Sequence, residues 1–200
     1  MQAHDVTYLI CLLGFLCGPA RADVFKPDSV ITDPAPARFS VCSEHTCSKV
    51  SVIGLEPAQW DGIRAVFMPA ARNAAQERAY IARAVTLMET LVGPLTGTAH
   101  DKGRIYQGVG LQGQMDCIDE STNTSLYLIM MVRDGLIKWH NVEDRATRGF
   151  FIFGWPHTTA VISDKQSGEL FAVDSWFLDN GQPPYILPLQ TWKDGWNPEP

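Results

Sequence analysis

The sequence has few cysteines, no cluster of basic residues and a single long apolar run. Its 200 residues include five cysteines, and its formal net charge is −6. A mildly acidic chain without a basic patch lacks the electrostatic footprint of a nucleic-acid-binding protein. No Cys-x-x-Cys pair occurs, so the usual dithiol redox motif is missing. We therefore expect no nucleic-acid partner and no thioredoxin-like redox function.

The one long apolar run lies near the N-terminus, over Tyr8–Cys17, and Ala20-Arg21-Ala22 follows it. The run is too short to cross a membrane as a helix. A short apolar core before an A-x-A site is typical of a secretory signal peptide. We expect residues 1–22 to be this signal and the rest to be exported, periplasmic or secreted. After cleavage we expect no membrane partner.

The chain after residue 22 divides into a proline-rich arm and one domain. Residues 23–38 are rich in proline and show no hydrophobic periodicity, which indicates an extended segment. Residues 39–200 have a suitable length for a single domain with a sizeable core.

Apolar residues recur at helical spacing in the first half of this domain. A helix that begins near residue 70 should bury one face. That face consists of Ile81, Val85, Met88 and Val92. Gly93-Pro94 is expected to end the helix, because proline fits poorly in a helix interior.

The second half of the domain contains runs of β-branched and aromatic residues, which favour strands. Two such runs, over 157–163 and 169–177, flank a turn that contains Gly168 and so predict a β-hairpin. The expected fold class is α+β, with N-terminal helices and a C-terminal antiparallel sheet. We further expect a strand or hairpin over 39–53, a turn over 57–60, a strand over 136–142, a polar connection over 141–148 and a short strand over 150–153.

Three cysteines remain after removal of the signal, and two of them are close together. Cys42 and Cys47 bound a short loop that an exported protein can close as a disulfide. The alternative is a partial metal site that adds His45, but no fourth ligand with zinc spacing is visible. We therefore expect a disulfide, no metal and no cofactor, and Cys117 is left as the odd thiol.

Cys117 lies where a glycine-rich loop meets a predicted helix. Asp116 is a good N-cap residue, and Arg133 followed by Gly135 is a stop signal. Free N–H groups at a helix start lower a thiol pKa, whereas the nearby acids Asp119 and Glu120 raise it. The simplest alternative is that Cys117 is a small buried hydrophobic residue.

The predicted hairpin places a histidine and an acid close together. If the turn is centred near residues 165–166, His157 lies opposite Asp174 on the same face. The carboxylate would then be near enough to accept a hydrogen bond from the imidazole. A register slip of one residue would instead put Asp174 on the other face.

A cysteine that begins a helix, a histidine that opens a strand and an aspartate that closes the next strand occur in that order. With Cys117-x-Asp119 at the helix start, this arrangement resembles the transglutaminase-like cysteine proteinases, an exported bacterial type within the papain-like thiol enzymes. The resemblance covers roughly residues 70–176. It implies a cysteine helix packed on an antiparallel sheet. It also implies Cys117 as nucleophile, His157 as general base and Asp174 as orienting acid.

These roles predict thiol-dependent acyl transfer on a peptide or protein substrate. The outcome is hydrolysis of an amide bond or transamidation, and the sequence does not separate them. The oxyanion would be bound by the N–H of Cys117 and by the side-chain amide of Gln112 or Gln114. The rival interpretation is a catalytically silent exported binding protein that retains the fold. Its ligand groove would contain three tryptophans, Trp139, Trp155 and Trp176.

Overall fold

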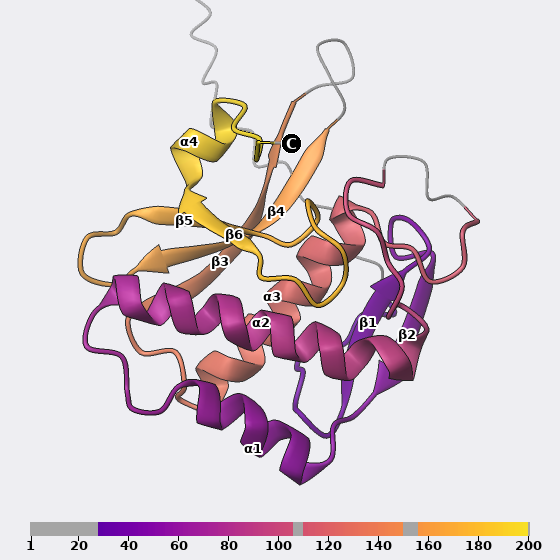
Figure 1. The fold of residues 1–200 in the computed structure, drawn as a ribbon, viewed down its shortest axis with the longest axis horizontal. Helices are drawn as coiled ribbons and strands as arrows, with labels where there is room; N and C mark the ends of the chain where they lie inside the picture. Colours follow the sequence, from indigo (N-terminus) through magenta and orange to yellow (C-terminus); the bar gives the residue numbers. More distant parts are fainter. Residues whose placement is uncertain (1–27, 106–109, 150–155, 200) are drawn as a thin grey trace, which may run out of the picture.

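The computed structural model describes residues 28–105, 110–149 and 156–199 and has an α+β fold (Figure 1). The predicted signal peptide and the strand predicted over 150–153 lie outside these residues. The elements, in chain order, are β1 (Phe39–Ser43), β2 (Lys49–Ile53), α1 (Pro57–Val66), α2 (Ala74–Thr96), α3 (Cys117–Arg133), β3 (His140–Arg148), β4 (His157–Asp164), β5 (Leu170–Asp174), β6 (Tyr185–Pro188) and α4 (Leu189–Lys193).

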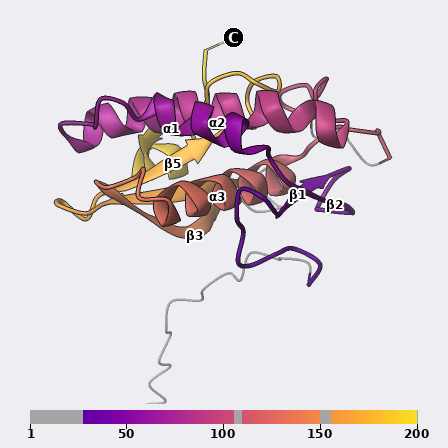
Figure 2. The ribbon, with the colours of Figure 1, turned by 90° about the horizontal axis from the view of Figure 1, so that it is seen from below.

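The C-terminal strands form an antiparallel sheet in the order β3-β4-β5-β6, and β1 pairs with β2 in a separate hairpin. Helix α3 packs against β3 and β4 on one side and against β1 on the other. Helices α1 and α2 form a further layer over α3 and the strands (Figure 2). Among the described residues, no helix combines the length and the apolar character that crossing a membrane requires.

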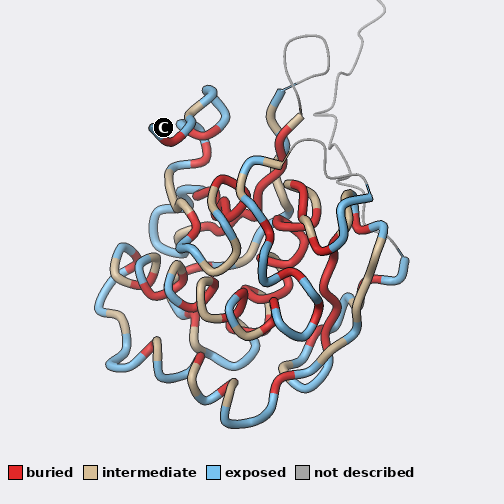
Figure 3. Tube along the Cα trace, turned by 45° about the vertical axis from the view of Figure 1, so that its right-hand side comes forward, coloured by how far each residue is buried: buried red, intermediate tan, exposed pale blue. Residues whose placement is uncertain are grey.

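The main core lies where α2, α3 and the sheet meet. The predicted apolar face of α2 is confirmed, because Ile81, Val85, Met88 and Val92 are at most 1% exposed. They pack with residues of α3 and the sheet in one cluster. Buried stretches gather in the middle of the molecule and exposed ones at its periphery (Figure 3).

Two predictions about the helices are wrong. Residues 57–60 form the start of α1 instead of a turn, because Pro57 suits the first helical position and Glu56 forms a capping box with Gln59. Helix α2 passes through Pro94 and ends only at Gly97, whose φ is 85°. The helix ends at Gly97 because the left-handed glycine lets its own N–H and that of the next residue return to the carbonyl oxygen of Gly93.

The segment over 141–148 is a strand, so the predicted polar connection is also wrong. β3 is an edge strand that pairs only with β4 in this sheet. Several of its side chains are exposed or half-buried, so polar residues are tolerated. A register shift between Glu143 and Ala146 further disturbs the alternation of side chains.

Three buried carboxyl groups form a cluster between α2, α3 and the loop that follows α2. Glu89 of α2, Asp101 and Glu120 of α3 are at most 5% exposed, and none of the salt bridges between described residues includes them. Burial raises the pKa of Glu89 to about 8 and that of Asp101 to about 7, and it raises the pKa of Glu120 well above its usual value. Glu89 and Glu120 therefore hold protons at neutral pH in the folded protein, and Asp101 does so in part.

This cluster predicts that the protein loses stability as the pH rises. Unfolded carboxyl groups release their protons at a pH of about 4, whereas Glu89 retains its proton to about 8. The folded state therefore binds more protons in this window, and the free energy of unfolding falls as the pH rises. Thermal unfolding at a series of pH values should show this fall. Glu89→Gln should flatten it, and Glu169→Gln at an exposed turn should not. A melting temperature that is constant or rises through this window would contradict the prediction.

Candidate active site

Cys117 is the first residue of α3, and a capping box fixes this end of the helix. Asp116 Oδ1 accepts hydrogen bonds from the N–H groups of Ile118 and Asp119, at 3.0 and 2.9 Å. The carboxylate of Asp119 accepts in return from the N–H of Asp116, at 3.2 Å. The predicted N-cap role of Asp116 is confirmed. The thiol is thus attached to a well-anchored helix start.

A cavity of about 270 Å³ lies over this helix start, and both Cys117 and His157 line it. Ile105, Ile118 and Trp176 form apolar parts of its wall. The thiol is half-buried, and its sulfur lies 4.0 Å from the carbonyl oxygen of the residue that precedes His157. The cavity therefore brings the nucleophile and the base of the sequence hypothesis to one space.

His157 and Asp174 are in direct contact, at 2.7 Å between Nε2 and Oδ2. The strand register differs from the predicted one, because Ala160 lies opposite Val173. This shift of two residues keeps His157 and Asp174 on the same face, so they meet as diagonal neighbours. The two residues are 5% and 2% exposed, which excludes water from their hydrogen bond.

Asp174 also binds two groups that sequence reasoning did not assign to the site. Its Oδ2 accepts a 2.7 Å hydrogen bond from Nε1 of Trp192 in α4, and its Oδ1 accepts from the N–H of Trp176, at 3.3 Å. Trp192 is fully buried, and its ring centroid lies 5.4 Å from that of His157. No pattern in the sequence predicts that α4 returns to Asp174, because only the tertiary fold brings them together.

The second ring nitrogen of His157 is in an unusual position. Nδ1 is buried and has no hydrogen-bond partner among the described residues. Because Nε2 faces a carboxylate, the neutral ring carries its proton on Nε2, and Nδ1 holds the free lone pair. Phe177 and the two tryptophans pack around the imidazole and restrict its rotation. His157 is therefore an imidazole with a fixed tautomer and a free lone pair, in a cavity that also holds a thiol.

The charge of the thiol depends on opposing effects. Burial raises the pKa of Cys117 to about 12, the N–H of Thr158 opposes the rise, and the carboxylates of Asp116 and Asp174 add to it. The helix start predicts a lower pKa, but here burial outweighs the N–H groups. The resting cysteine is a neutral thiol that must lose its proton to a base before it can react.

Arg145 of β3 lies against the same turn of α3. Its guanidinium donates to the carbonyl oxygen of Ile118, at 3.3 Å, and to Oγ of Ser121, at 3.2 Å. Burial lowers its pKa, and the proximity of Cys117 and Asp116 opposes that effect. The sequence did not indicate this contact, since β3 was predicted as a connection.

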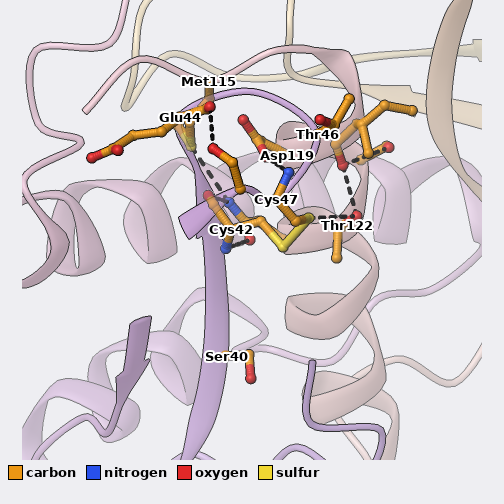
Figure 4. The surroundings of a disulfide bond; sticks show 12 residues. Ser40, Cys42, Glu44, Thr46, Cys47, Met115, Asp119 and Thr122 are labelled. Atoms are coloured by element: carbon orange, nitrogen blue, oxygen red, sulfur yellow. Dashed lines mark hydrogen bonds between the residues drawn. A yellow bond between two sulfur atoms is a disulfide. The ribbon is translucent and has the colours of Figure 1, made fainter. Parts of the chain in front are cut away.

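A disulfide joins Cys42 and Cys47, whose Cα atoms are 4.5 Å apart (Figure 4). Glu44, His45, Thr46 and Cys47 all have positive φ, so their N–H groups turn to one side. The N–H groups of His45 and Cys47 donate to the carboxylate of Asp119, at 2.9 and 2.6 Å, and that of Thr46 donates to Asp116, at 3.1 Å. The loop thereby satisfies the acids on both sides of the thiol.

This geometry leaves no place for the alternative metal site in the loop. The sulfur atoms of Cys42 and Cys47 lie near a carboxylate oxygen of Asp119, a grouping with the spacing of metal ligands. Both sulfurs are bonded to each other, however, and a metal requires thiolates.

The two glutamines proposed for the oxyanion hole do not line the cavity. Gln112 is exposed. The side chain of Gln114 donates to the carbonyl oxygen of His100, at 3.2 Å, and accepts from the N–H of Lys102, at 3.1 Å. Both contacts bind Gln114 to the loop that precedes the thiol, so neither amide is placed for the predicted role.

The predicted tryptophan groove is not assembled as expected. Trp176 lines the cavity beside Cys117, but Trp139 lines a different cavity of about 310 Å³ between α1, α2 and the end of α3. That second cavity contains neither Cys117 nor His157. Trp155 lies outside the described residues.

Comparisons with known proteins leave the family open. No family model, no curated protein and no solved structure matches this chain.

Loss of the disulfide should destabilise the protein without preventing folding. Closing so short a loop stabilises the folded state by about 2–3 kcal/mol in the chain-entropy model. The double variant Cys42→Ser/Cys47→Ser should lower the free energy of unfolding in urea by this amount. A non-reduced peptide map of the parent protein should contain the linked peptides. Two free thiols in that map, or unchanged unfolding of the variant, would contradict this prediction.

Proposed function

We propose that the protein is an exported thiol enzyme that transfers acyl groups through Cys117, His157 and Asp174. The observation that carries this proposal concerns Nδ1 of His157, which is buried in the cavity that also holds Cys117 and has no hydrogen-bond partner in the described part of the chain. A buried nitrogen without a hydrogen-bond partner costs free energy, and we take this cost as a sign that Nδ1 accepts a proton during the reaction. The thiol of Cys117, which lines the same cavity, can supply the proton that Nδ1 would accept.

In the first half of the reaction, the thiol proton moves to Nδ1 of His157 while the sulfur of Cys117 bonds to the substrate carbonyl carbon. Asp174 stabilises the imidazolium that forms, through its 2.7 Å contact with Nε2. The carbonyl electrons move to oxygen and then return, which expels the amine. The amine takes the proton from Nδ1, and a thioester remains on Cys117.

In the second half, water or a second amine attacks the thioester and gives its proton to His157. The thiolate of Cys117 then leaves and takes this proton from His157, which restores the neutral thiol and imidazole. Water as the nucleophile gives hydrolysis, and an amine gives transamidation. The raised pKa of Cys117 favours a mechanism in which proton transfer accompanies the attack over one that uses a standing thiolate.

Backbone groups are better placed than the glutamines to bind the oxyanion. The N–H of Cys117 is at the start of α3, where helix N–H groups have no carbonyl partner within the helix. The N–H of Thr158 is also close enough to bond to the sulfur. These two donors replace the predicted amides of Gln112 and Gln114 in the proposed mechanism.

The fold and the disulfide support a more specific assignment. A helix that begins with the cysteine and packs on an antiparallel sheet agrees with the layout implied by the transglutaminase-like cysteine proteinases. The proposed substrate is accordingly a peptide or protein. Disulfides persist in oxidising compartments, which supports export to the periplasm or beyond.

The proposal predicts that Cys117 reacts with iodoacetamide only with the help of His157. His157→Ala should slow alkylation of Cys117 by about 10²-fold or more, the usual contribution of a general base. Asp174→Asn should also slow the reaction, because the amide neither fixes the tautomer of His157 nor stabilises the imidazolium that forms. The rate is measured by mass spectrometry of the Cys117 peptide.

His100→Gln is the matched control, since His100 is exposed and does not line the cavity. Circular dichroism should confirm that each variant is folded. Equal rates in the parent, His157→Ala and Asp174→Asn would overturn the triad and leave a binding protein that retains the fold.

A further inference from the structure

A second histidine, His45, lines the same cavity as Cys117 and His157. It comes from the disulfide-closed loop, far from the other site residues in the sequence. Its φ of 75° is in the left-handed region, which residues other than glycine adopt infrequently. The loop keeps this conformation because its N–H groups bind the carboxylates of Asp116 and Asp119.

The imidazole of His45 is in contact with the carboxylate of Asp116. Its Nδ1 is buried and lies 3.0 Å from Oδ2 of Asp116, a charge contact without the alignment of a hydrogen bond. The side chain as a whole is 29% exposed, so the exposed part is the rest of the ring. Nε2 has no hydrogen-bond partner among the described residues. The outer edge of the ring is therefore available to a ligand.

The other charged groups around the cavity are already occupied. Asp116 is 6% exposed, and its oxygens accept from three N–H groups besides the contact with His45. Asp174 is held by His157 and Trp192. Arg145 bonds to the first turn of α3. No free carboxylate is thus left to meet a substrate among the described lining residues.

We infer that His45 determines substrate specificity by binding an anionic group of the acyl donor beside the scissile bond. An acidic peptide, with a carboxylate near the bond that is cleaved, is the substrate class that fits. This inference rests on the proposed acyl-transfer function. The apolar wall of Ile105, Ile118 and Trp176 strengthens the attraction of a charged imidazole for an anion.

The charges that face His45 come from several elements. Asp116 lies against its ring, Lys49 and Glu44 form a 3.0 Å pair on the same hairpin, and Arg145 approaches the α3 turn from β3. Asp119 also accepts from the backbone N–H of His45, at 2.9 Å. Of the described residues that line the cavity, only the two histidines can carry positive charge, and His157 is already paired with an acid.

Two alkylating reagents of nearly equal size test this inference. Iodoacetate is an anion and iodoacetamide is neutral, and both alkylate accessible cysteine thiols. The ratio of their rates is measured by mass spectrometry at several pH values from about 6 to about 8, a range that includes conditions in which His157 can act as the neutral base. His45→Asn removes the charge and tolerates the left-handed backbone, since asparagine adopts that conformation readily. His45→Arg keeps a positive charge, and His100→Gln is the control outside the cavity.

We expect the ratio of iodoacetate to iodoacetamide rates to fall about fivefold in His45→Asn, the size of one charge interaction across a partly exposed cavity. His45→Arg should preserve the ratio, and His100→Gln should not change it. An unchanged ratio in His45→Asn overturns the role of His45 and leaves the proposed triad intact. If neither reagent modifies Cys117 in the folded parent protein, the acyl-transfer function fails and this inference fails with it.

Discussion

The proposed site depends on one buried carboxylate, that of Asp174. It fixes the imidazole of His157 at 2.7 Å, binds the indole of Trp192 at 2.7 Å and accepts from the backbone of Trp176. Strand β4, strand β5 and helix α4 therefore meet at a single charged group. A buried charge is tolerated only when donors surround it. The same donors that stabilise the carboxylate set the ring orientation that a general base requires.

Two further acids, Asp116 and Asp119, flank the thiol at the start of α3. Asp116 and Asp119 would repel a thiolate, and burial further raises the pKa of Cys117. The disulfide loop compensates by giving three backbone N–H groups to these carboxylates. The loop also places His45 at the cavity, so stability and recognition depend on the same short segment. The site is therefore suited to a neutral thiol and imidazole that become charged only during the attack.

The sequence predicted the parts of this protein that local patterns control. The apolar face of α2, the cap of α3 and the hairpin of β4 and β5 follow from periodicity, capping and turn residues. The predicted turn centre is one residue away from the observed one, which shifts the pairing by two residues and keeps the side chains on the same face. The contacts of Trp192, Arg145 and His45 were not predictable, because they join segments distant in sequence. Gln112 and Gln114 were chosen by type alone, and the loop directs Gln114 elsewhere.

Capture of the covalent intermediate tests the central claim most directly. An activated acetyl ester such as p-nitrophenyl acetate supplies an acyl group without requiring the natural substrate. The account predicts that the folded protein is acetylated at Cys117, as seen by mass spectrometry of intact protein and peptides. It also predicts that the acetyl group is then lost to water or to an added amine, and that His157→Ala forms the thioester far more slowly. A folded parent protein that forms no acetyl thioester at Cys117 would contradict the account.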